Sequence, residues 1–510
     1  MKRVLSYFSL FILLIFTHYQ ALPKRSLLSQ CIRKKYGCCL FPQFTCTDNT
    51  FCQLYVNQNM CTLIQEIPLE LQNLPYAIYP NCISYNLSRF IYNKRFNIFP
   101  HAIIKPCKTS ELIYVLKILR QYNLAFSIRS GGHCFESGSL SPQYIIDLEN
   151  FNSIELDIEN QQVFVGAGAR LGCLIQTLGN FNFAIPTGTC GTNGVGGLTL
   201  GGGIGFLARQ FGLTCDVVKN ITIVTADLNV ITVDNNNYSD LFFALRGAGN
   251  GSYGIVLGFT FNMIYLPKVS FLELKWNWDP TLVPLIVNAF QSWITTLSND
   301  ITAQIDFDYL NGLRTITITG FKTGNEPFTE WMSPFSSLNP QVNLQVIPYV
   351  DAAKIIGGDS PFPFLKSKSK MLFAPLSDPA ISIIVAFFQD LFNNNKPYSV
   401  SLQLGSAGGA LTQGNTAYFP RQAFEWFFQH IRWNDEDQEA DALATIDTFY
   451  STIEPFTSPY SYANIVDYDL VGNTFLNAYY GTNVNTLIQI KNKYDPTNFF
   501  NWQQSIPLFI

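Results

Sequence analysis

Charge is scarce in this chain of 510 residues. Only 13% of the residues are Asp, Glu, Lys or Arg, about half of the ~25% that is usual in globular proteins. Aromatic residues make up 15% and apolar residues 47%, which excludes a disordered or fibrous chain. The 36 acidic residues outnumber the 32 basic ones, and the sequence has no stripe of basic residues that could neutralise the phosphates of a nucleic acid. The composition therefore argues against a nucleic-acid partner.

Histidine is also scarce, and cysteine is missing from most of the chain. There are four His, with none between His18 and His101, and all 12 Cys lie in the first 215 residues. Six of these cysteines fall within residues 31–61, where the lack of His argues against zinc. In a secreted chain this segment predicts a disulfide-stapled module, whose connectivity the sequence leaves open.

Only one apolar run has the features of a targeting segment. Lys2 and Arg3 precede the run 4–16, and Ala21 stands at a possible cleavage point. Residues 1–21 are therefore predicted to be a signal peptide, since a membrane anchor needs roughly 20 apolar residues. We expect a secreted, extracellular protein with no membrane segment in its mature form. Sequons at Asn86, Asn220, Asn237 and Asn250 predict a glycoprotein.

Hydrophobic periodicity predicts an α+β fold with more than one domain. After a Cys-rich module (22–75), helix and strand signals alternate over 76–268, and longer strands and helices fill 269–460. The last segment, 461–510, is again rich in aromatic residues. Helices are predicted over 112–119, 171–178, 379–392 and 420–431, strands over 125–129, 144–148, 162–166, 302–309 and 314–319, and a hairpin from 220–226 and 229–233.

Glycine-rich loops are the strongest local signal. Nine of the eighteen residues in 188–205 are Gly, and further clusters occur at 131–132 and 247–254. Glycine lets backbone N–H groups approach a ligand closely, and such concavities bind phosphates. Three separated loops therefore predict an extended ligand with a diphosphate, such as a dinucleotide. The Rossmann spacing is absent, and tight turns in a β-rich fold are the alternative.

The segment Arg129-Ser130-Gly131-Gly132-His133 resembles the flavin-attachment motif of berberine bridge enzyme-like FAD-linked oxidoreductases. This family belongs to the vanillyl-alcohol oxidase superfamily with PCMH-type FAD binding. Residues 188–205 resemble its second attachment segment, and further motifs match at 246–255, 407–410, 416–421, 480–483, 494–499 and 504–506. The resemblance implies a two-part PCMH-type FAD-binding domain (76–268), a substrate domain with an antiparallel sheet flanked by helices (269–460), and a C-terminal segment (461–510) that returns to the FAD domain.

The resemblance further implies FAD attached through two bonds, one to His133 and one to Cys190. Imidazole and thiolate are nucleophiles that can add to an electron-poor ring. No metal is expected. The cofactor-binding residues that the resemblance implies are Arg129, Ser130, Gly131, Gly132, His133, Cys190, Gly194, Gly197, Gly202, Gly249, Gly254, Ile255, Tyr494 and Asn498.

In such enzymes a hydride passes from a substrate C–H to the flavin while a tyrosinate or carboxylate takes the hydroxyl proton. The family motif Tyr-x-Asn-Tyr-x-Asp is altered here, because Ile465 stands in place of the second Tyr. Isoleucine cannot accept a proton. Tyr462, Asp467 and Tyr479 are therefore the candidate catalytic residues, with Tyr468 as an alternative.

These features predict an FAD-linked oxidoreductase that oxidises an alcohol, either a sugar or an oligosaccharide hydroxyl, with a small-molecule alcohol or carbohydrate as its partner. Molecular oxygen would reoxidise the flavin and yield hydrogen peroxide. Two alternatives stay open. One is a catalytically impaired flavoprotein or carbohydrate-binding protein, and the other is a dehydrogenase with a different electron acceptor.

Overall fold

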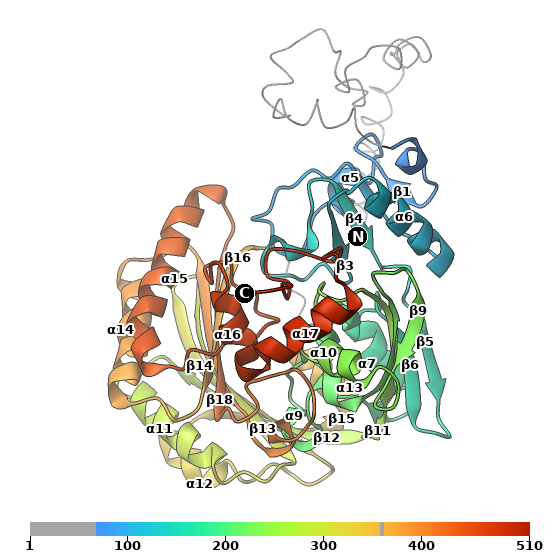
Figure 1. Ribbon diagram of the computed structural model, residues 1–510. Coiled ribbons are helices and arrows are strands. Elements are labelled where there is room, and N and C mark those ends of the chain that lie inside the picture. The colour runs from blue at the N-terminus through green and yellow to red at the C-terminus, as the bar shows by residue number, and fades with distance from the viewer. Residues whose placement is uncertain (1–67, 358–361) are drawn as a thin grey trace, which may run out of the picture.

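The computed structural model describes residues 68–357 and 362–510 (Figure 1). The predicted signal peptide, and all but the last eight residues of the predicted Cys-rich module, lie outside these ranges. Within the described residues, no helix has the length and apolar character that crossing a membrane requires.

The first sheet has four short strands in a mixed arrangement. In spatial order they are β1 (Ala77–Ile78), β2 (Ala102–Ile104), β4 (Tyr144–Asp147) and β3 (Phe126–Arg129). Strand β4 is parallel to β2 and β3, whereas β1 is antiparallel to β2. Helix α6 (Thr109–Gln121) connects β2 and β3 and buries Leu112, Val115, Leu116 and Leu119. The predicted helix and the predicted strand before His133 are confirmed.

The second sheet has five antiparallel strands. Their order is β5 (Ile154–Asp157), β6 (Gln162–Gly166), β10 (Ile255–Asn262), β8 (Val218–Val224) and β9 (Val230–Val233). The pairing of β8 with β9 confirms the predicted hairpin. One hydrophobic core joins both sheets. Beside them lie the small pair β7 (Phe183–Ala184) and β11 (Ile264–Tyr265) and the helices α5 (Tyr85–Ser88), α7 (Leu171–Gly179), α8 (Val195–Leu200), α9 (Ala208–Phe211) and α10 (Ser239–Leu245).

The third sheet has seven antiparallel strands and begins at residue 268, beside the predicted domain boundary. Its order is β15 (Gln341–Pro348), β12 (Lys268–Asn277), β14 (Leu313–Thr323), β13 (Ile301–Leu310), β17 (Ser399–Ser406), β18 (Glu425–Trp433) and β16 (Phe364–Leu372). Helices α11 (Val283–Ile294), α14 (Asp378–Asn393) and α15 (Glu439–Ile453) cover one face, at the left of Figure 1. The short helices α12 (Met332–Phe335) and α13 (Tyr349–Ile356) complete this part.

Alternation along β13 shows how the two faces of this sheet differ. Ala303, Ile305 and Phe307 belong to the core beneath the helices. Gln304 and Asp306 alternate with them, so they point to the opposite face. That face is turned towards the first two sheets.

The predicted helix over 420–431 is wrong, because these residues lead into the interior strand β18, which pairs with both β17 and β16. Phe427 and Ile431 pack in the core under the helices, whereas Trp426 and Phe428 pack in a separate cluster on the other face. A strand that is apolar on both faces loses the alternation of polar and apolar residues that identifies a half-buried strand.

The C-terminal segment returns to the first two sheets. Its helices α16 (Thr474–Tyr480) and α17 (Val484–Tyr494) place Phe475, Leu487 and Ile490 in the same core as those sheets. In Figure 1 both helices lie at the front of the molecule. Lys491 of α17 is fully buried, and its Nζ donates to Asp495 Oδ2 at 2.6 Å and to the carbonyls of Ser252 and Phe500 at 2.7 Å.

Replacing Lys491 with Met should loosen the C-terminal segment. The substitution leaves the Asp495 carboxylate buried without its cation, which costs about 3–5 kcal/mol in the free energy of unfolding. Lys493→Met is the matched control, because the Lys493 ammonium is exposed and pairs with Asp240 at the surface. Urea unfolding of both variants tests this, and equal losses in the two variants would contradict it.

Candidate active site

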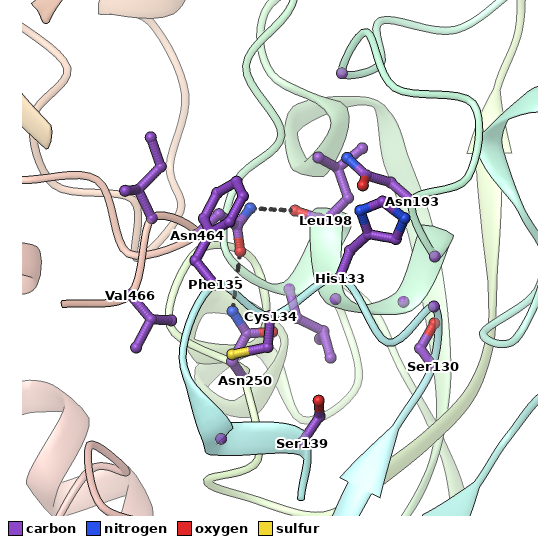
Figure 2. A pocket seen from close by; sticks show the side chains of 18 of the residues that line it. Ser130, His133, Cys134, Phe135, Ser139, Asn193, Leu198, Asn250, Asn464 and Val466 are labelled. Atoms are coloured by element: carbon purple, nitrogen blue, oxygen red, sulfur yellow. Dashed lines mark hydrogen bonds between the residues drawn. The ribbon is translucent and has the colours of Figure 1, made fainter. Parts of the chain in front are cut away.

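A cavity of about 510 Å³ lies where the three sheets and the C-terminal segment meet. Its walls come from segments that are far apart in the sequence: 126–135, 188–206, 250–256, strand β18, 462–466 and 500–502. Figure 2 shows His133, Asn193 and Asn464 at this cavity, each from a different segment.

Two glycine-rich backbones touch at one side of the cavity. A Cβ atom on Gly131 would overlap the backbone nitrogen of Gly194, and a Cβ on Gly194 would overlap Ser130 Oγ. No residue but glycine fits at either position without moving a backbone. Arg170 ties the same two segments together, because its Nη1 donates to the carbonyl of Gly131 and, at 2.7 Å, to that of Thr192. The His133 loop and the Cys190 loop are thereby held against each other.

The neighbouring glycines play other parts. Gly132 has a φ of 65°, which places it in the left-handed region that favours glycine. Ser130 Oγ donates to the carbonyl of Ala167 at 2.6 Å. Gly197 is exposed to the cavity, and a Cβ there would meet nothing within 4 Å. The space that a ligand can use therefore begins at the Cα of Gly197.

Arg129 lies behind the wall. Its Nη2 is 2.7 Å from Asp147 Oδ2 on β4, its Nη2 also donates to the carbonyl of Ser88, and both ionic side chains are 5% exposed. This buried pair fixes the end of β3, so Arg129 sets the direction in which residues 130–133 leave the strand. Its side chain does not line the cavity.

His133 and Cys190 both line the cavity. The His133 ring stacks on Tyr92 with ring centroids 4.4 Å apart and an interplanar angle of 19°. Burial, with a contribution from Arg170, lowers the pKa of His133 to about 4, so its imidazole is neutral at neutral pH. Cys190 is free within the described part of the chain, and its Sγ is 3.2 Å from Thr192 Oγ1.

Fewer of the predicted cofactor-binding residues in and beside the third glycine-rich loop, 247–254, line the cavity. Gly254 lines the cavity, and a Cβ there would overlap the carbonyl of Val224. Gly249 packs on Leu245 and Ile255 is buried within β10, and Gly202 of the earlier segment 188–205 packs on Tyr418. Asn250 lines the cavity and donates to Asn464 Oδ1 at 3.1 Å (Figure 2), so its sequon lies in the cavity wall.

Tyr494 and Asn498 lie on the C-terminal segment away from the cavity. Tyr494 Oη donates to Asp240 Oδ1 at 2.8 Å, which joins α17 to α10. Asn498 has a φ of 53° and a buried Oδ1 that accepts no hydrogen bond from the described residues. Tyr494 and Asn498 therefore hold the C-terminal segment in place and form no part of the cavity wall.

Tyr462 lines the cavity, but its hydroxyl oxygen is already surrounded by donors. The backbone N–H groups of Gly203 and Ile204 approach it at 3.0 and 3.2 Å, and Asn464 Nδ2 at 2.9 Å. Burial raises the pKa of Tyr462, and these donors oppose that rise. Its lone pairs are occupied by the protein itself.

The other candidate catalytic residues lie outside the cavity lining. Asp467 Oδ1 is 2.7 Å from Lys366 Nζ, and Asp467 Oδ2 is 3.6 Å from Lys368 Nζ, with the carboxylate 6% exposed. Tyr479 Oη accepts from the backbone of Asp467 at 2.9 Å, and burial raises its pKa well above the usual value. Tyr468, the alternative, does not line the cavity either. The geometry gives Asp467 and Tyr479 structural partners in place of a substrate.

The seven-stranded sheet supplies a wall that the sequence analysis missed. Gln304, Gln403, Trp426, Phe428, His430 and Arg432 line the cavity from β13, β17 and β18. Behind them, Asp306 Oδ1 accepts from Gln304 Nε2 at 2.7 Å and from Gln403 Nε2 at 2.9 Å. Burial, then Asp308, raises the pKa of Asp306 to about 7. Alternation along β13 was the signal that could have revealed this polar face.

Comparison with known proteins agrees with this architecture. A family model described as FAD binding domain matches residues 100–234, and one described as berberine and berberine like matches residues 461–507. Berberine bridge enzyme-like 12 of Arabidopsis thaliana is 30% identical over 485 residues, covering 82% of this chain and 88% of the relative.

Solved structures show the same fold. BBE-like 1 of Physcomitrella patens superposes with a TM-score of 0.77 at 27% identity, covering 85% of this chain and 97% of that one. A chitooligosaccharide oxidase superposes with a TM-score of 0.75 at 24% identity, covering 88% and 98%.

The fold is that of an FAD-dependent oxidoreductase of the α+β, PCMH-type class. Within that class, the chain belongs to the berberine bridge enzyme-like family of FAD-linked oxidoreductases. The residues present suit FAD. Glycine backbones without Cβ atoms line the cavity at 131, 132, 194 and 197, and a neutral imidazole and a free thiol stand in the same walls.

Enlarging the side chain at Gly197 should block flavin binding without disturbing the fold. A methyl group at 197 meets only the open cavity, so Gly197→Ala and Gly197→Val should both fold normally. Because the valine side chain occupies more of the cavity, Gly197→Val should bind less flavin than Gly197→Ala. The ratio of flavin to protein absorbance, read beside the melting temperature, measures this. Full flavin content in Gly197→Val would contradict the assignment of this space to FAD.

Proposed function

We propose that this protein holds FAD by two covalent bonds, to His133 and Cys190, and oxidises an alcohol, specifically a sugar or oligosaccharide hydroxyl. The observation that carries the proposal is that both side chains line one cavity, on two backbones pressed together at Gly131 and Gly194. The remaining proposed cofactor contacts are those of the glycine-rich loops around this cavity.

The state of both side chains supports the covalent attachment. An imidazole adds to an electron-poor carbon only through a free lone pair, and the low pKa of His133 keeps that lone pair unprotonated. Stacking on Tyr92 fixes the plane of the ring. Cys190 is free to form a thioether because no described cysteine pairs with it.

When bound, FAD supplies the acceptor for a hydride from a substrate C–H bond. The chain supplies the rest. Arg170 and the Gly131–Gly194 contact hold the two attachment loops, and the sheet wall faces them. Asp306 holds Gln304 and Gln403 through their amide nitrogens, which leaves both amide carbonyls to accept hydrogen bonds from substrate hydroxyls.

A carbohydrate substrate suits this wall. A sugar ring has hydroxyls on its rim and C–H groups on its faces. The amide carbonyls of this wall can accept hydrogen bonds from the hydroxyls, and the aromatic rings of Trp426 and Phe428 can contact the C–H groups. The chitooligosaccharide oxidase that shares the fold is named for such a substrate. We propose that the protein is secreted, because residues 1–21 have the pattern of a signal peptide. We also propose that molecular oxygen reoxidises the flavin and is reduced to hydrogen peroxide.

A second function keeps one specific observation in its favour. Ile465 lines the cavity where the family motif has a tyrosine, so a catalytically impaired flavoprotein or carbohydrate-binding protein is the alternative. A dehydrogenase differs only in its electron acceptor. Reoxidation by a quinone or dye but not by air identifies the dehydrogenase.

The covalent bonds can be tested by acid precipitation. Yellow colour should stay with the precipitated wild-type protein, because neither bond is hydrolysed. His133→Ala and Cys190→Ala should each retain some flavin through the remaining bond, and the double variant should release all of it. Colour that leaves the wild-type precipitate would contradict the proposal. Cys173→Ala, at an exposed cysteine outside the cavity, is the matched control.

The alcohol substrate can be tested without oxygen. Anaerobic addition of mono- and oligosaccharides should bleach the flavin absorbance near its visible maximum, since hydride transfer reduces the ring. A substrate that binds without bleaching would favour the impaired flavoprotein. If neither sugars nor simple alcohols bleach it, alcohol oxidation is wrong for this protein.

A further inference from the structure

Oxidising an alcohol to a carbonyl removes a proton from oxygen as well as a hydride from carbon, and the protein must receive that proton. Ile465 stands where the family motif has its second tyrosine, and an isoleucine cannot accept a proton. The hydroxyl oxygen of Tyr462 already accepts hydrogen bonds from the protein. Asp467 is paired with Lys366 and lies outside the cavity lining. We propose that Nε2 of His430 accepts the hydroxyl proton of the substrate. This assignment rests on the proposed alcohol oxidation.

The position of His430 on β18 gives it access to the cavity from the substrate side. It lines the cavity on the same face as Phe428 and Arg432, which are two residues away on either side. Directly opposite on β16 stands Ser367, whose Oγ is 2.7 Å from His430 Nδ1. Ser401 is its partner on β17. The ring is therefore held at one nitrogen by a residue of the neighbouring strand.

The other nitrogen is left for a ligand. His430 Nε2 makes no hydrogen bond within the described residues, yet it is not sealed in the protein. His101 provides the contrast, since its Nε2 is fully buried without a partner and the residue does not line the cavity. When Nδ1 carries the proton and donates it to Ser367 Oγ, Nε2 presents a lone pair to the cavity.

The surroundings keep this lone pair free. The neighbours Ser367, Ser401 and Phe135 carry no charge, and among the described residues the charged group that acts on the ring is Arg432 on its own strand. Burial first, and Arg432 second, lower the pKa of His430 to about 3. The imidazole is therefore neutral throughout the physiological pH range and does not need to lose a proton before it can act.

The other polar groups of the sheet wall cannot accept the hydroxyl proton of the substrate. The guanidinium of Arg432 has hydrogen-bond donors and no acceptor, and the amides of Gln304 and Gln403 have no basic nitrogen. Burial raises the pKa of the Cys134 thiol to about 11, so it carries no thiolate. Among the described residues of this wall, His430 alone offers an unprotonated nitrogen.

The step balances as a two-electron oxidation. The substrate C–H bond breaks with its electron pair leaving as hydride to the FAD oxidant, the O–H bond breaks with its proton passing to His430 Nε2, and a C=O bond forms. The imidazolium then returns its proton to solvent, which its low pKa favours.

The tautomer of His430 can be observed directly. In flavin-loaded protein labelled with ¹⁵N-histidine, four histidines give few signals, and His430→Gln identifies the one in question. We expect a protonated Nδ1 and an unprotonated Nε2 between about pH 5 and pH 8. A protonated Nε2, or an imidazolium in that range, would overturn the proposal whatever the enzyme oxidises.

The rate tests the role itself. In His430→Gln, the anaerobic rate of flavin reduction at saturating sugar should fall by about 10²–10⁴-fold, while the sugar dissociation constant changes less than about tenfold. Ser367→Ala should lower the rate less and give a mixture of tautomers. His101→Gln, at the buried histidine outside the cavity, should reduce at the wild-type rate.

The outcomes separate this proposal from the proposed function. If wild-type protein is bleached by sugar and His430→Gln is bleached equally fast, alcohol oxidation stands and the assignment of His430 fails. If the variant loses binding and rate together, His430 positions substrate without taking its proton, and the assignment also fails. If no alcohol bleaches the wild type, both fall together.

Discussion

The contact between two backbones, at Gly131 and Gly194, is the constraint on which the rest of the site depends. Since neither position tolerates a Cβ atom, the loop after β3 and the loop before α8 can approach until their main chains touch. Arg170 then bridges their carbonyls. This brings His133 and Cys190, 57 positions apart in the sequence, to the walls of one cavity. A covalent flavin needs such an arrangement before any bond forms.

Buried ion pairs determine where the remaining walls stand. Arg129 and Asp147 fix the strand that delivers His133, and Lys491 with Asp495 fixes the C-terminal segment on the core of the first two sheets. Lys366, on the edge strand β16, joins Glu136 beside the His133 loop to Asp467 of the C-terminal segment. A cavity assembled from distant segments depends on such pairs, because each is strongly destabilising to break.

The sequence predicted the glycine-rich walls of the cavity far better than the wall formed by the seven-stranded sheet. Helix α6, strand β3 and the β8–β9 hairpin were predicted because their apolar residues repeat with one clear period. Strand β18 was predicted as a helix, since it is apolar on both faces, and this concealed His430. The motif around Asp467 did not disclose the direction of its side chain, because its partner Lys366 lies 101 residues away.

Peptide mapping tests the central claim most directly, namely that one flavin joins the two loops. Digestion of the purified protein under non-reducing conditions should yield a fluorescent or coloured species in which a peptide containing His133 and a peptide containing Cys190 are linked through a single FAD-derived group. Tandem mass spectrometry would locate both bonds. Recovery of the two peptides unmodified, from a protein that was yellow before digestion, would contradict the account.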